Sequence, residues 1–341
     1  MKKAYIFLGL TIFFIVSLAS AQGELFIYNW TDYTSPDLIA KFESETGIKV
    51  TLDTYDSNET LLAKLKSGAT GYDIIVPSHN FVPVFIQEGL LEPLNATDLP
   101  GYSNIDGRWQ NPDWDPENVY SIPWQWGTTS FTVNTEKYTE PVDSLKTLFE
   151  PPVELQGQLG MFTSPDEVIT MAEIYLGLPS CNENVEDMKK VQELLLAQKP
   201  FVKLYSSENI YERMAAAEVL MHQHWNGSAM RARAENPAVK YIFPKEGVLT
   251  WMDNLAIAKG SPNKENAIKF IEFMMQPENA GLQSNFARYA NGIAGSEAFM
   301  DADLSSAPEI GIPEGVTARF TPACSAAAIE LMDRVWTKVK Q

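Results

Sequence analysis

Apolar and polar positions follow two different periods along the first quarter of the chain, and each change of period marks an expected element boundary. Alternation with period two predicts a strand, and apolar residues that share one helical face predict a helix. Serine, proline and aspartate at positions 35 to 37 are typical of a helix start, and a later glycine is typical of its end. The expected elements are a strand at residues 24–28, a helix ending at Gly47, a strand at residues 48–52, a helix at residues 59–66 and a buried strand at residues 72–76.

The same alternation of strands and helices returns in the second half of the chain. Such alternation predicts an α/β fold, with a mostly parallel sheet and helices on both faces. The mature chain is also longer than one hydrophobic core usually serves, so we expect two lobes. The second set comprises a strand at residues 158–162, helices at residues 165–176 and 183–198, and a strand at residues 218–223.

The first 21 residues have the organisation of a secretory signal peptide. Two lysines precede an apolar run from residue 4 to residue 19, and Ala19-Ser20-Ala21 fits the small-residue rule for cleavage after Ala21. Residue 22 is Gln rather than Cys, which argues against a lipid anchor. We therefore expect a soluble protein in the periplasm of a Gram-negative bacterium.

The chain is acidic, with a formal net charge of −18, and removal of the two leader lysines makes the mature protein more acidic still. Nucleic acid is excluded as an expected partner, because phosphate binding needs a basic patch. An acidic surface favours cations, although acidity also serves solubility alone. The oxidising compartment permits a disulfide between Cys181 and Cys324, which the sequence by itself does not decide.

Trp251-Met252-Asp253 is the most informative candidate for binding chemistry. On an extended strand, residues two apart point to one face, so the indole and the carboxylate would lie side by side. That pair suits an organic cation, which a ring face attracts and a carboxylate neutralises. A buried Trp beside a solvated Asp is the other interpretation. The chemistry recurs at Trp30-Thr31-Asp32-Tyr33 and at Trp225.

The candidate residues fall where an α/β sheet places ligands, beyond the carboxyl ends of its strands. Trp30 to Tyr33 follow the first strand, and Ser78 follows the strand at residues 72–76. Glu167 comes after the strand that ends at residue 162, and Trp225 comes after the strand at residues 218–223. Aromatic residues chosen only for core packing would not gather at these positions.

Motifs for catalysis are absent from the sequence. It contains no nucleophile elbow, P-loop, dinucleotide fingerprint, H-E-x-x-H or C-x-x-C. His222 and His224 would share a strand face but lack a third ligand at a suitable spacing, so no metal site is predicted, and no cofactor. Ser164 and Glu167 also fit a capping box, in which the glutamate would fold back onto the helix start instead of facing a ligand.

Several ordered motifs carry a family resemblance. They are NWTDY, ETGIKV, YDSNETLLAKLKSG and YDIIVPS in the first quarter, then YSIPWQWGTTSFTVN, HWNGSA, FPKEG, WMDNLAI and VWTKVK. Together they resemble the periplasmic spermidine/putrescine-binding proteins of ABC transporters, over essentially the whole mature chain. The resemblance implies a two-lobed periplasmic binding protein of type II, whose lobes close on the ligand about a hinge.

The resemblance also implies a division of the chain into lobes. We expect each lobe to hold a mixed sheet flanked by helices, with two crossover strands, near residues 129–134 and near Asp253, as the hinge. The expected division is a signal peptide at residues 1–21, a first lobe of residues 22–131 and 254–313, and a second lobe of residues 132–253 and 314–341.

The ligand set is likewise implied by the resemblance, as aromatic walls around a methylene chain with carboxylates for the amines. The implied walls are Trp30, Tyr33, Trp225, Trp251 and Tyr289, the amine acceptors are Asp253 and Glu167, and the polar contacts are Thr31 and Ser78. Ser164, Asn80 and Thr321 depart from the spermidine-preferring pattern. The sequence around Tyr289 and the C-terminal VWTKVK lean towards the putrescine-preferring branch.

The expected function is therefore capture of a polyamine, putrescine or spermidine, and its delivery to an ABC permease of the inner membrane. We expect a monomer that catalyses no reaction and needs no cofactor. Two alternatives stay open at this point. One is a binding protein of the same fold for another organic cation or for ferric iron, and the other is a secreted hydrolase that uses Asp253 and Glu167 as an acid/base pair.

Overall fold

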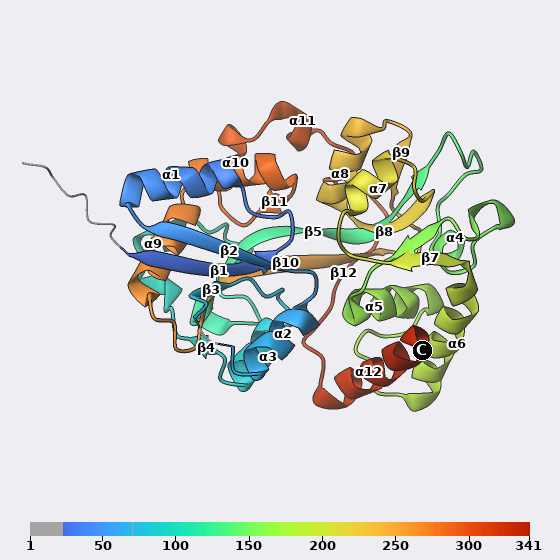
Figure 1. Ribbon diagram of the computed structural model, residues 1–341, viewed down its shortest axis with the longest axis horizontal. Helices are drawn as coiled ribbons and strands as arrows, with labels where there is room; N and C mark the ends of the chain where they lie inside the picture. The colour runs from blue at the N-terminus through green and yellow to red at the C-terminus, as the bar shows by residue number, and fades with distance from the viewer. Residues whose placement is uncertain (1–22, 70) are drawn as a thin grey trace, which may run out of the picture.

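The computed structural model describes residues 23–69 and 71–341 (Figure 1). The expected signal peptide, residues 1–21, lies outside the described residues. The strands are β1 (Glu24–Trp30), β2 (Lys49–Tyr55), β3 (Ile74–Ile75), β4 (Leu91–Glu92), β5 (Ser121–Asn134), β6 (Leu159–Met161), β7 (Val202–Tyr205), β8 (Met221–Trp225), β9 (Val239–Ile242), β10 (Val248–Ala258), β11 (Ala290–Asn291) and β12 (Ala318–Phe320).

The helices are α1 (Pro36–Thr46), α2 (Asn58–Lys66), α3 (Val82–Gln87), α4 (Lys146–Phe149), α5 (Pro165–Leu176), α6 (Val185–Gln198), α7 (Ile210–Ala215), α8 (Asn226–Glu235), α9 (Lys264–Met274), α10 (Pro277–Ala287), α11 (Ala302–Ser305) and α12 (Ala326–Lys340). Short 3-10 turns cover Ala96–Asp98, Pro100–Asn104, Pro116–Asn118, Val153–Leu155, Lys199–Phe201 and Ser296–Phe299.

Two long antiparallel strands, β5 and β10, run through the length of the molecule and connect its two halves (Figure 1). On β5, Trp124 packs in one hydrophobic core and Phe131 in the other. On β10, Leu249 belongs to the second core and Trp251 to the first. Each strand therefore passes from one core to the other within a few residues, which places its middle between the two lobes.

Lobe 1 is built on the sheet edge β2-β1-β3-β10, in which β1 pairs in parallel with both neighbours. Helices α1 and α9 contribute Phe42 and Phe270 to the core on one face of this sheet. The start of α1 follows the sequence signal, because Ser35 accepts a hydrogen bond from the Leu38 amide and Gly47 takes a left-handed conformation at the end. The loop after β1 is thereby held at the middle of the molecule.

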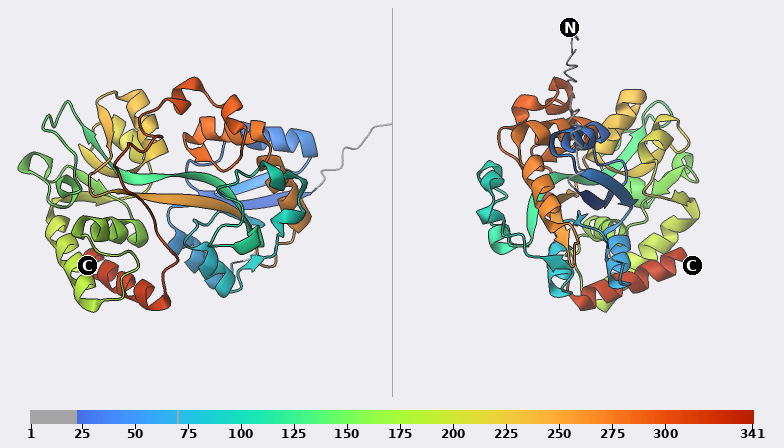
Figure 2. Two further views of the ribbon diagram at one scale, coloured as in Figure 1. Left: turned by 180° about the vertical axis from the view of Figure 1, so that it is seen from behind. Right: turned by 60° about the vertical axis from the view of Figure 1, so that its left-hand side comes forward.

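Lobe 2 is built on β5-β8-β6-β7, with α5, α6 and α12 packed on it. Its core includes Phe149, Phe162 and Val191. A third connection between the lobes is the segment that follows α11, pairs with β10 through β12 and reaches α12 (Figure 2). A disulfide joins Cys181 to Cys324 just before α12, which answers the question that the sequence left open.

The predicted α/β fold with two lobes is confirmed. The sheet is mixed instead of mostly parallel, because the long strand β5 pairs antiparallel with β10 and with β8. The helix predicted at residues 165–176 has those bounds, whereas the strand predicted at residues 72–76 is shorter, Ile74–Ile75. β8 continues to Trp225 instead of ending at Gln223. The division of the chain between lobes at residues 131, 253 and 313 stays a prediction.

Candidate ligand-binding site

A cavity of about 830 Å³, part of which is open to solvent, lies between the two lobes at the middle of β10. All nine residues predicted for the site line it, although they come from widely separated parts of the chain. They are Trp30, Thr31, Tyr33, Ser78, Glu167, Trp225, Trp251, Asp253 and Tyr289. Trp124 and Trp126 of β5 are not among the residues that line it.

Asp253 is placed by an irregularity in β10. The pairing of β10 with β5 shifts register between Met252 and Asn254, so that Asp253 forms a bridge with Ser78 instead. The Ser78 hydroxyl donates to Asp253 Oδ1 at 2.6 Å, and Asn58 Nδ2 donates to the same hydroxyl oxygen at 3.0 Å. This chain of hydrogen bonds fixes the carboxyl group at the cavity wall.

Burial controls the charge of Asp253, whose side chain is almost wholly enclosed. Removal from water raises the pKa of this carboxyl to about 7, although the hydrogen bond from Ser78 favours the charged form. In the part of the chain that the structure describes, no lysine or arginine pairs with it. A cation that binds from solution would therefore supply the counter-charge for the ionised Asp253 carboxylate.

Glu167 faces the same cavity from α5 of lobe 2. The capping-box alternative is wrong in this structure, because Ser164 makes no side-chain capping bond and Glu167 turns to tertiary partners. Its Oε1 accepts from Thr129 Oγ1 and from Trp225 Nε1, each at 2.7 Å. Burial raises the pKa of this carboxyl to about 8, against the effect of both hydrogen bonds.

Aromatic rings form the walls between these two carboxyl groups. Trp30 of lobe 1 meets Trp225 of lobe 2 edge to face, with ring centroids 6.1 Å apart. Trp251 and Tyr289 contact at 5.1 Å, and Tyr33 meets Tyr289 at 5.5 Å. Faces of electron-rich rings attract cations and pack well on methylene groups, so this wall suits an aliphatic amine.

Backbone features hold these rings close together. Gly127 on β5 lies opposite Trp251, and a Cβ at that position would come within 2.7 Å of the Trp251 ring. Trp30 is fixed by a hydrogen bond from its Nε1 to the carbonyl of Val76, at 3.0 Å. The Tyr33 carbonyl accepts from Gln283 of α10, which ties the loop after β1 to that helix.

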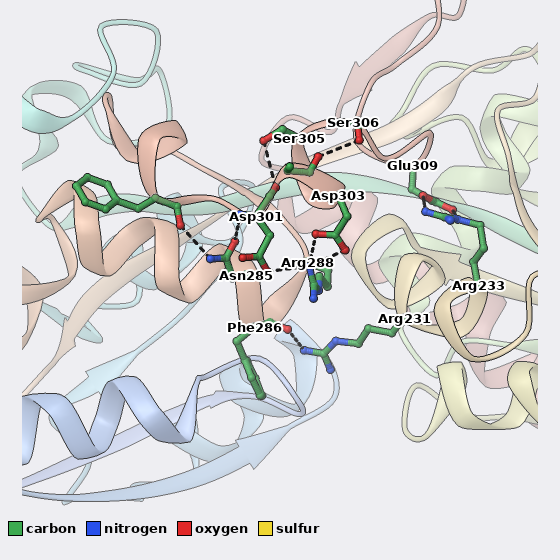
Figure 3. Close-up of polar contacts among 12 residues, drawn as sticks. Arg231, Arg233, Asn285, Phe286, Arg288, Asp301, Asp303, Ser305, Ser306 and Glu309 are labelled. Atoms are coloured by element: carbon green, nitrogen blue, oxygen red, sulfur yellow. Dashed lines mark hydrogen bonds and ion pairs between the residues drawn. The ribbon is translucent and has the colours of Figure 1, made fainter.

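The two lobes contact each other on both sides of the cavity, which is the closed arrangement of a two-lobed binding protein. On one side, Thr163 Oγ1 of lobe 2 donates to Asp56 of lobe 1 at 2.9 Å. On the other, Arg231 of α8 reaches across to the carbonyl of Phe286 at 2.6 Å and lies over its ring (Figure 3). The same guanidinium donates to the Asp32 carbonyl at 3.2 Å.

The sequence reasoning missed several residues that line the cavity. One of them is His79, which is buried and hydrogen-bonds the Thr321 carbonyl, and burial lowers its pKa to about 4. Asp166 also lines the cavity, whereas Ser164, two residues earlier, does not. Asn58, which precedes the helix predicted at residues 59–66, lines the cavity as well. No local pattern marks these positions, because their partners lie far away in the sequence.

Two features are absent from residues 23–69 and 71–341. They contain no group of three or more His, Cys, Asp or Glu side chains placed to hold a metal ion. Within the same residues, no helix has the length and apolar character needed to cross a membrane.

Comparison with known proteins places the chain in a family. The sequence profile of the bacterial extracellular solute-binding proteins matches residues 37–311. The chain belongs to this family. A putrescine/agmatine-binding protein of Pseudomonas aeruginosa is 32% identical over 94% of this chain and 93% of its own length. The spermidine/putrescine-binding periplasmic protein of Escherichia coli is 37% identical over 77% of this chain and 75% of its own length.

A solved structure agrees with these relatives. A Listeria monocytogenes protein assigned to spermidine/putrescine ABC transport superimposes with a TM-score of 0.87 at 31% identity, over 93% of this chain and 99% of that one. The resemblance noted in the sequence is thus confirmed for the family and for the fold.

Proposed function

We propose that this protein captures a polyamine between its lobes, in the periplasm, and presents it to an ABC permease. The observation that carries the proposal is the pair of buried carboxyl groups, Asp253 and Glu167, in one aromatic-walled cavity. Neither carboxyl forms an ion pair with a basic side chain of the described residues. A diamine has two cationic ends and an apolar chain between them, which is the complement of that arrangement. The names of the relatives support the same ligand class.

In this proposal each lining residue has a defined role. Asp253 and Glu167 accept the two ammonium groups, and Ser78 and Thr31 provide polar contacts nearby. The five aromatic residues Trp30, Tyr33, Trp225, Trp251 and Tyr289 enclose the methylene chain. These roles depend on closure, because the carboxyls and rings come from both lobes. A ligand that bridges the lobes shifts the population towards the closed form, which is the form that a permease would recognise.

We propose further that the protein works as a monomer and performs no chemistry. Ferric iron is a poorer candidate for this cavity, since iron coordination favours phenolate oxygen and burial raises the pKa of Tyr33 well above its ordinary value. The hydrolase alternative keeps one feature in its favour, two carboxyls with raised pKa values in one cleft. Assays for glycoside turnover distinguish it from a binding protein.

Calorimetry with a panel of ligands tests the proposal. Putrescine, spermidine, agmatine and cadaverine are titrated into the mature protein after any bound ligand has been removed by unfolding and refolding. 1,4-Butanediol, which has the chain of putrescine without its charges, is the matched control. We expect saturable binding of at least one polyamine at one site per chain and no heat from the diol. Equal responses to the diol and the diamine would contradict the role of the carboxyls.

A further inference from the structure

A second cavity adjoins the first where α5 of lobe 2 meets α2 and α3 of lobe 1. Asn80 and Asp166 line both cavities, so the two spaces share a wall. The second cavity is also lined by the carboxyl groups of Glu59 and Asp333. Its lysine, Lys66, is already paired with Glu88 at 2.9 Å. A ligand that extends beyond Glu167 along α5 therefore meets further acidic groups.

Two of these acidic groups meet across the closed cleft, and neither has a salt-bridge partner among residues 23–69 and 71–341. Asp166, whose residue is only 8% exposed, accepts from Asn80 Nδ2 at 2.9 Å, and its own amide donates to Glu59 Oε1 at 3.1 Å. The second oxygen of Glu59, Oε2, is buried and has no hydrogen-bond partner in the part of the chain that the structure describes. Burial raises the pKa of both carboxyls, and repulsion from Asp166 raises that of Glu59 further.

A second polar atom without a partner belongs to a residue that lines the first cavity. Thr321 is 2% exposed, and its buried hydroxyl oxygen has no hydrogen bond within residues 23–69 and 71–341. The His79 ring holds the Thr321 carbonyl at 2.9 Å, which brings Thr321 beside the turn that carries Asn80. Buried polar atoms rarely stay unpaired, and an ammonium group has three donors to offer. Glu59 and Thr321 thus point independently to a missing cation.

We propose that Asp166 and Glu59 form a further ammonium subsite, which lets the protein accept a triamine of the spermidine kind as well as a diamine. This inference rests on the proposed function and specifies its ligand. A triamine that closes the cleft must pair its extra charge, because an unpaired buried ammonium is costly. At position 164, where the spermidine-preferring pattern has a carboxylate for the extra ammonium group, this chain has Ser164. The structure puts another carboxyl, Asp166, in the cavity instead.

The test compares the two polyamines in matched variants of the full mature chain. Asp166→Asn and Glu59→Gln remove one charge each with little change of shape. Asp333→Asn is the control, since this carboxyl lines the second cavity from an exposed position on α12. We expect Asp166→Asn to weaken spermidine binding about tenfold or more. Putrescine affinity should stay the same or improve slightly, because two facing carboxyls would no longer repel each other.

Proton exchange gives a second readout, obtained by calorimetry at pH 7 in buffers with different ionisation enthalpies. Closure around putrescine leaves Asp166 and Glu59 without a cation, so their raised pKa values should cause proton uptake. Closure around spermidine should take up fewer protons. The difference between the two amines should shrink in Asp166→Asn and in Glu59→Gln but persist in Asp333→Asn, which a purely structural role of these groups would not produce.

The possible outcomes distinguish failure of the proposed function from failure of the subsite alone. Binding of neither amine to the wild type would overturn the proposed function, and the subsite with it. Binding of putrescine alone, or an equal loss of spermidine in Asp166→Asn and Asp333→Asn, would overturn the subsite and leave the proposed function intact.

Discussion

Replacement of Asp253 by asparagine should separate ligand affinity from protein stability. Asp253 is 4% exposed, receives one hydrogen bond from Ser78 and has no basic partner among the described residues. Asparagine has the same shape and still accepts the Ser78 hydrogen bond, so the change removes only the charge. Loss of one partner of a buried charge pair costs about 2 to 5 kcal/mol. The dissociation constant for putrescine should therefore rise about 30-fold to several thousandfold.

The same substitution should not weaken the ligand-free protein. A pKa raised by burial means that the charged carboxyl is disfavoured in the folded state, so above pH 7 a neutral amide relieves a cost. Asp73→Asn is the matched control, because Asp73 is fully buried but serves the fold, through Phe26, Ser261 and Asn263.

Calorimetry and thermal unfolding measure the two effects side by side. Asp253→Asn should lose affinity while its Tm is unchanged or higher. Asp73→Asn should lower Tm and leave affinity nearly unaltered. A putrescine dissociation constant within about threefold of the wild type in Asp253→Asn would refute the reasoning, because a desolvated ammonium cannot lose its counter-charge at so small a cost.

Three further predictions follow from the cavity and the contacts around it. Putrescine should change the tryptophan emission of the wild type. Trp225→Ala should weaken putrescine binding at least tenfold, because it removes part of the cavity wall and the hydrogen-bond donor to Glu167. A titration without any change in emission would place the indoles outside the site. Small-angle scattering of the ligand-free protein should show a larger radius of gyration at pH 8.5 than at pH 5. Burial in the closed form raises the pKa of Asp253 to about 7 and that of Glu167 to about 8, so the ligand-free protein closes most easily when both carboxyls are protonated. A radius of gyration independent of pH would contradict this prediction. Arg231→Met should lower the affinity for all polyamines about 30-fold without changing their ratio, because it removes two hydrogen bonds worth roughly 1 kcal/mol each. The exposed control Arg334→Met should have no effect.

Local signals in the sequence predict the helices and strands that position the site. Ser35 and Gly47 mark the ends of α1, and the proline at residue 165 begins α5 as expected. The strand-end rule also predicts that Trp30 and Trp225 lie together, because residues at strand ends in an α/β sheet converge whatever their sequence separation. Tyr289 was implied only by the family resemblance.

Other features depend on contacts that no local pattern contains. Glu167 has the spacing of a helix cap, and only its bonds to Thr129 and Trp225 show that it faces the cavity. Asp166 is an acidic residue in the first turn of α5, a position that favours a negative charge in any helix. Its environment comes from Asn80 and Glu59, about 100 residues away in the other lobe. Tertiary placement, not residue type, decides the role of such groups.

The most direct test of the central claim is a crystal structure of the mature protein with putrescine. The account predicts one ammonium group on the Asp253 carboxylate, the other on Glu167, and the methylene chain between the rings of the two lobes. An ammonium group bound elsewhere, with both carboxyls free of contact to the ligand, would contradict it.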